Sequence, residues 1–75
     1  MEKYYKINLL DEGCLAPNMT LDYILKHCND FVGCTRDKKQ IKKMIRYYED
    51  KFIDGVAYYA IFEYLGKDII NVEIM

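Results

Sequence analysis

The chain has 75 residues, of which 52% are hydrophobic and 15% aromatic, and its formal net charge is −1. That length predicts one domain, residues 1–75, with little volume for an enclosed ligand pocket. The near-neutral charge excludes a global field that attracts nucleic acid or membranes, and no apolar run is long enough to span a bilayer.

The first predicted element is a strand over residues 3–10. The segment KYYKINLL alternates in character, with Tyr5, Ile7 and Leu9 on one side, which is typical of a strand with one buried face. Gly13 and Pro17 then break the pattern. No signal peptide precedes this strand, so we expect a cytoplasmic protein.

The segment TLDYILKHCNDFVG, residues 20–33, predicts a first helix. Thr20 can cap its start, and Gly33 stands where a helix usually ends. Its apolar side chains share one face at helical spacing: Leu21, Ile24, Leu25 and Cys28.

A second helix is predicted from about Arg36 to Asp54, with Thr35 as its cap and Gly55 past its end. The apolar positions recur at i, i+3, i+4 and i+7, which indicates a helix with one buried side. These positions are Ile41, Met44, Ile45, Tyr48 and Phe52.

The segment from residue 56 to residue 75 predicts a β-hairpin that turns at Gly66-Lys67. A two-residue loop would place Tyr64 opposite Ile69 and Ile61 opposite Val72. The expected core face then holds Ala57, Tyr59, Ile61, Leu65, Ile70, Val72 and Ile74.

Together these elements predict an α+β fold in the order β-α-α-β-β, with a three-stranded antiparallel sheet and two helices packed on one face. The alternative order is β-α-α-α-β, because Tyr58, Ile61, Phe62 and Leu65 also fit a helical stripe that Gly66 could end.

Charge is concentrated in residues 36–46, which hold six basic residues and one acidic residue. On the predicted helix 36–54 most of these cations lie opposite the apolar side. They could dock on an acidic protein surface or meet two or three phosphates. The third interpretation is a solvated outer face, since Glu49 and Asp50 can pair with Arg46. We call five of these cations the basic row: Lys38, Lys39, Lys42, Lys43 and Arg46.

Aromatic residues form a second candidate surface. Tyr47 lies beside Lys43 on the helix, away from the apolar side. The outer face of the predicted sheet shows Tyr4, Tyr58, Phe62 and Tyr64, a pattern typical of a protein interface. The alternatives are a platform that stacks single-stranded bases and a face covered by a further loop or a second copy of the chain.

Catalytic and metal chemistry are poorly supported. The four potential zinc ligands are Cys14, His27, Cys28 and Cys34, but no C-x-x-C pair exists among them. The single histidine has no residue that a motif places to orient it. We therefore expect no catalytic residue, no metal and no cofactor. We expect reduced thiols in the cytoplasm, and one disulfide is the alternative.

No motif identifies a family. In size, lack of motifs and richness in tyrosine and lysine, the chain resembles the short accessory proteins of phages and mobile elements, which include anti-CRISPR proteins. That resemblance implies a non-enzymatic binding protein that occludes or modulates a host protein, such as a nucleic-acid-processing or defence enzyme. The alternatives are a small nucleic-acid-binding protein that uses the basic helix and a homodimeric structural module. The expected partner-binding residues are the basic row together with Tyr47, Tyr58, Phe62 and Tyr64.

Overall fold

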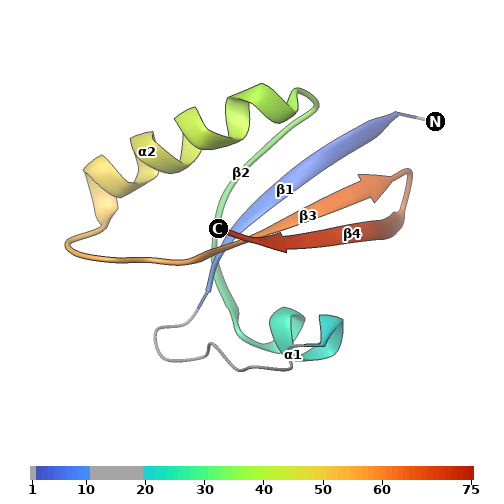
Figure 1. Ribbon diagram of the computed structural model, residues 1–75, viewed down its shortest axis with the longest axis horizontal. Helices are drawn as coiled ribbons and strands as arrows, with labels where there is room; N and C mark the ends of the chain where they lie inside the picture. Colours follow the sequence, from blue (N-terminus) through green and yellow to red (C-terminus); the bar gives the residue numbers. More distant parts are fainter. Residues whose placement is uncertain (1, 11–19) are drawn as a thin grey trace.

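The computed structural model describes residues 2–10 and 20–75. The elements run in the order β1 (Lys3–Leu10), α1 (Leu21–Lys26), β2 (Cys28–Thr35), η1 (a 3₁₀ turn, Lys38–Gln40), α2 (Ile41–Phe52), β3 (Tyr59–Leu65) and β4 (Asp68–Ile74). Figure 1 shows α2 lying across one side of an antiparallel sheet, with α1 beyond the end of the sheet where β2 begins. The α+β fold is confirmed, but the sheet has four strands, in the order β2-β1-β3-β4, rather than three. The predicted breaks at Gly13 and Pro17 lie outside the described residues.

The extra strand comes from the second half of the predicted first helix. The helix begins as expected, because the Tyr23 backbone N–H donates to the Thr20 hydroxyl over 3.1 Å. It ends at Lys26, however, and β2 starts at Cys28. The prediction of one helix over residues 20–33 is therefore wrong, because pairing with β1 overrides a weak helical preference.

Gly33 consequently does not end a helix. It lies in β2 opposite Ile7, and a Cβ added there would meet the terminal methyl group of Met44. The glycine lets α2 approach the sheet closely at this position.

The predicted strand at residues 3–10 is confirmed, but the expectation of one buried face is wrong. β1 lies between β2 and β3, and its middle residues are buried on both faces of the sheet. Ile7 is 0% exposed on the side of the sheet that α2 covers, which we call the α2 face. Its neighbour Asn8 is 8% exposed on the opposite side, which we call the α1 face.

The second helix is confirmed between Lys38 and Phe52, counting η1 and α2 together. The cap differs from the prediction. The Lys39 N–H donates to the Asp37 carboxylate over 3.0 Å, while Thr35 accepts from the Asp37 N–H. After the helix Gly55 adopts a positive φ of 112°, which an L side chain rarely tolerates.

The hairpin is confirmed, and the alternative third helix is wrong. Gly66 takes a positive φ of 63° in the turn, and Tyr64 lies opposite Ile69 as predicted. A register shift next to Tyr64 then places Val72 opposite Phe62 instead of Ile61. Because side chains alternate between the faces of a strand, this one-residue slip changes which face each following residue occupies.

The core is therefore divided between the two faces of the sheet. On the α2 face the buried cluster comprises Ile7, Ile41, Ile45, Tyr59 and Ile61. On the α1 face it comprises Leu10, Ile24, Ala60 and Phe62, with Val72 and Ile74 packed against it. The predictions that Val72 and Ile74 share a face with Ile61 and that both helices pack on one face are thus wrong. Ile70, also predicted in the core, is 46% exposed.

Candidate interaction surface

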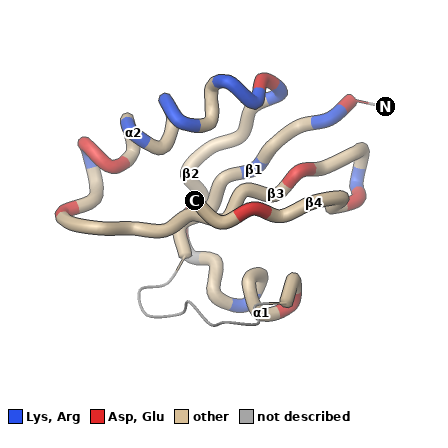
Figure 2. The backbone as a smooth tube through the Cα atoms, viewed as in Figure 1, with Lys and Arg blue, Asp and Glu red and all other residues tan. Residues whose placement is uncertain are grey.

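All five side chains of the basic row are exposed. They project from η1 and α2 because Ile41 and Ile45 point into the core from the same helix. Figure 2 shows basic residues along the first part of this segment and acidic residues toward its end. The predicted orientation of the lysine-rich helix is confirmed, and η1 and α2 together carry these cations.

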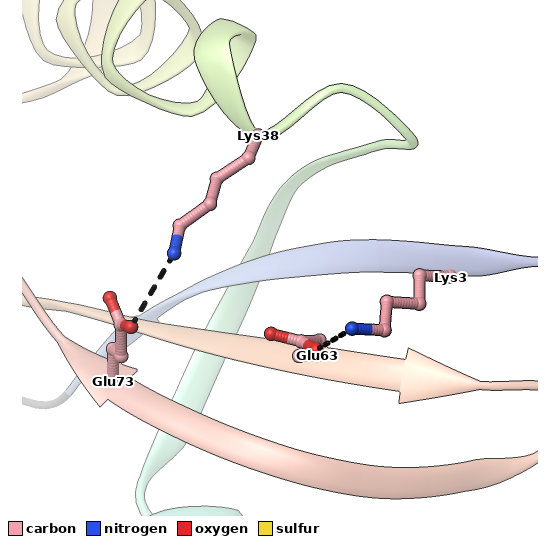
Figure 3. Close-up of polar contacts among 4 residues, drawn as sticks. All are labelled: Lys3, Lys38, Glu63 and Glu73. Carbon is pink, nitrogen blue, oxygen red and sulfur yellow. Dashed lines mark ion pairs between the residues drawn. The ribbon is translucent and has the colours of Figure 1, made fainter.

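Most of these cations have no carboxylate partner. Among the ion pairs of residues 2–10 and 20–75, the basic row contributes only Lys38, whose Nζ lies 3.9 Å from Glu73 Oε1 (Figure 3). In particular, Arg46 forms no ion pair with Glu49 or Asp50 in this part of the chain, although their spacing allowed one. The charge of Lys39, Lys42, Lys43 and Arg46 is thus available to an external anion.

An open groove separates α2 from the end of β4. Its larger part, about 610 Å³, is lined by Lys38, Lys39, Ile41, Lys42, Glu73 and Met75. A second part of about 280 Å³ shares Lys42 and Met75 with the first and continues toward Ile45, Arg46, Glu49, Ala57 and Tyr59. We call the two parts the α2–β4 groove. It has cations along its helix wall and apolar side chains at its base.

Tyr59 belongs to the lining of this groove and carries an unsatisfied polar atom. The residue is 2% exposed, and its hydroxyl has no hydrogen-bond partner among the described residues. The pKa of Tyr59 is raised to about 12, chiefly by burial and in smaller part by the nearby charges of Glu49 and Tyr48. The hydroxyl therefore stays protonated at neutral pH.

This raised pKa makes stability depend on alkaline pH. An ordinary tyrosine ionises near pH 10.0, so the unfolded chain loses this proton before the folded chain does. The contribution of Tyr59 is complete below pH 10 and is lost as the pH rises toward about 12. We expect Tyr59→Phe to reduce the fall of the urea midpoint over that interval. Burial and the nearby Asp30 also raise the pKa of Tyr48, so part of the fall should persist in the variant. Equal pH profiles for the two proteins would contradict the assignment.

The other flank of α2 is more apolar. Tyr47 is 62% exposed, as predicted, and Lys51 Nζ lies 4.6 Å from its ring centroid. Phe52 is 68% exposed, although it was predicted to be buried. The apolar side of α2 continues for one turn past the part of the helix that packs on the sheet, and Phe52 lies in that last turn. These side chains border an open hollow of about 350 Å³ lined by Val32, Lys43, Met44, Tyr47, Tyr48 and Phe52.

The predicted aromatic patch on the sheet is only partly present. Phe62 is 2% exposed, so the prediction that it forms part of an exposed aromatic patch is wrong. It lies on the face opposite α2, as expected, but Ile24 of α1 and Val72 of β4 pack around it. Tyr64 is half-buried and stacks on Tyr4, with ring centroids 4.8 Å apart. Tyr58 is 43% exposed just before β3.

Cys28 and Cys34, the two cysteines among the described residues, are separated in the fold. Cys28 and Cys34 are six positions apart in one strand, which corresponds to about 20 Å. They can neither form a disulfide with each other nor share a metal ion. Cys34 is exposed as a free thiol, and Cys14 lies outside the described residues. The described residues contain no group of three or more potential metal ligands. Neither α1 nor α2, the helices of this part, has the length and apolar character needed to cross a membrane.

Sequence reasoning missed Tyr59, Glu73 and Met75 as parts of the groove. Their approach to the basic row depends on the packing of α2 against the sheet and on the register slip in β4. No local signal in the sequence could have indicated this contact.

Comparison with known proteins does not identify the chain, because no protein-family model, curated protein or solved structure matches it. The function is therefore argued from the surface itself.

Proposed function

We propose that this protein is a small non-enzymatic binding protein that docks on an acidic surface of a partner protein and thereby blocks it. The observation that carries the proposal is the basic row, five exposed cations of which Lys38 alone has a carboxylate partner in the described structure. From residue 38 to residue 46 the row extends about 12 Å along the helical segment. A row of exposed positive charges of this length favours rapid and oriented encounter with a complementary acidic surface.

An acidic protein surface fits the surroundings of the row better than nucleic acid does. Glu73 lies in the groove below the lysines, and Glu49 and Asp50 follow at the end of α2. These carboxylates would repel a phosphate backbone that ran along the whole helix. Met75 and Tyr47, both substantially exposed, add apolar area beside the cations, which is typical of protein interfaces.

The proposed biological setting rests on the small size of the chain and its lack of motifs. Inhibition of a host nucleic-acid-processing or defence enzyme by a phage or mobile-element protein, as anti-CRISPR proteins do, fits this mechanism. The row would then cover an acidic region of the enzyme and not its nucleic-acid channel, because such channels are themselves basic.

Charge reversal tests the proposal. The tagged protein is used to capture its partner from the native host, and the dissociation constant is then measured with the purified partner. We expect Lys39→Glu/Lys42→Glu to weaken binding by roughly tenfold or more. Lys67→Glu is the matched control, because Lys67 is an exposed lysine in the distant hairpin turn. If the double variant and the control bind equally well, the basic row is not the docking surface.

Nucleic-acid binding is the second candidate, because the same unpaired cations could contact phosphates. Titration of generic DNA and RNA against salt measures it directly. A slope of about −2 to −4 in log K against log salt, with the same sensitivity to Lys39→Glu/Lys42→Glu, would favour this candidate. Absence of binding at low salt would leave the acidic protein partner as the better explanation.

A further inference from the structure

β4 is an edge strand whose outer side has free backbone groups. Met75 donates to the Tyr59 carbonyl over 2.9 Å and accepts from the Tyr59 N–H over 2.8 Å. In an antiparallel ladder such pairs alternate along the strand. Val72 and Ile74 therefore direct their N–H and C=O groups away from β3. No strand of residues 2–10 or 20–75 pairs with that side, so it can accept another strand.

This free edge lies next to the basic row. The larger part of the α2–β4 groove is lined by η1, α2 and the end of β4, and by no residue of β1, β2 or β3. Figure 3 shows Lys38 reaching from η1 toward Glu73 on β4. A strand added to β4 would consequently run beside the lysines, and its continuation past Met75 would approach Arg46 and Tyr59.

The two faces of the sheet at β4 favour different side chains in an added strand. On the α2 face an added strand would meet the cations of the groove, which outnumber Glu73. On the α1 face it would extend the apolar surface of Val72 and Ile74. Side chains on one face of a strand recur about every 6.6 Å, so the row of about 12 Å matches two or three of them. The fitting segment alternates acidic and apolar residues.

We propose that β4 binds an extended segment of the partner, in which acidic and apolar residues alternate, as a fifth strand of the sheet. This inference rests on the proposed function and names the part of the partner that is recognised. Carboxylates of the segment pair with Lys39, Lys42 and Arg46, and its backbone bonds to Val72 and Ile74.

A second copy of the chain fits this edge less well. Antiparallel pairing of β4 with its copy would place both α2 helices on the same side of one continuous sheet. The two basic rows would then flank the same edge, and their like charges would repel each other.

A synthetic peptide tests the inference. The probe is a labelled peptide of about eight residues that alternates Glu and Val, and the control peptide has the same composition in two blocks. We expect fluorescence anisotropy to show binding of the alternating peptide, weakened by salt, and clearly weaker binding of the block peptide. No binding of the alternating peptide at low salt, or equal binding of both peptides, would overturn the inference.

A backbone variant tests the edge itself. Ile74→Pro removes an outward N–H without removing a bond to β3, so the fold should persist. We expect it to raise the dissociation constant of the alternating peptide roughly tenfold, while Ile74→Val leaves it unchanged. Hydrogen exchange on the unaltered protein provides a readout that needs no variant. The Val72 and Ile74 amides should be protected by the peptide, and the β2 edge should not.

The outcomes separate this inference from the proposed function. Full binding by Ile74→Pro, with loss in Lys39→Glu/Lys42→Glu, would overturn strand addition and leave docking by the basic row intact. If neither variant lost binding, both strand addition to β4 and docking by the basic row would be overturned. A dimer seen by light scattering and dissociated by Ile74→Pro would assign the edge to a second copy and overturn the inference.

Discussion

Replacing Phe62 with alanine is expected to destabilise the domain by about 3–5 kcal/mol, which is the usual effect of removing a buried phenylalanine ring. Phe62 is 2% exposed and packs with Leu10, Ile24 and Ala60 on the α1 face of the sheet. Small domains have free energies of unfolding of about 5 kcal/mol or a little more, so the variant should be largely unfolded at 37 °C. Urea denaturation followed by circular dichroism measures the effect.

Phe52→Ala is the matched control for this experiment. The same ring is removed, but Phe52 is 68% exposed and contacts mainly Tyr48. We expect a change of about 0.5 kcal/mol or less. Equal losses for the two variants would show that the α1 face does not bury Phe62 as described.

Ile45→Asp is expected to abolish folding. Ile45 lies in the middle of α2 and packs into the cluster formed with Ile7 and Ile61. The substitution removes that apolar contact and puts a carboxylate into an apolar cluster, which costs on the order of several kcal/mol. The amide spectrum of the purified protein should show loss of dispersion at neutral pH.

Lys43→Asp tests the opposite side of the same helix. Lys43 is exposed, so this variant should fold with a melting temperature within a few degrees of the parent. If Lys43→Asp unfolded the protein and Ile45→Asp did not, α2 would present its other side to the sheet. The basic row would then not be an exposed surface, and both proposals would fail.

The candidate surface was predictable where it depends on one helix. Helical periodicity placed Lys39, Lys42 and Lys43 outward, and the structure agrees. The exposure of Tyr47 followed from the same geometry. Phe62 was assigned to the correct face of its strand, but the cover that Ile24 and Val72 provide was not apparent. That cover depends on where α1 packs and on a register shift, and neither of these leaves a periodic signal.

By itself, the sequence determined α2, the turn at Gly66-Lys67 and the strand at residues 3–10. Each of these depends on interactions between residues a few positions apart, so periodicity, caps and glycine preferences are sufficient to predict it. Only the tertiary structure decided that Cys28–Thr35 is a strand, that β1 is central and that Val72 faces Phe62. Those features depend on hydrogen bonds and packing between segments far apart in the chain, where a slip of one residue changes the face of every side chain that follows.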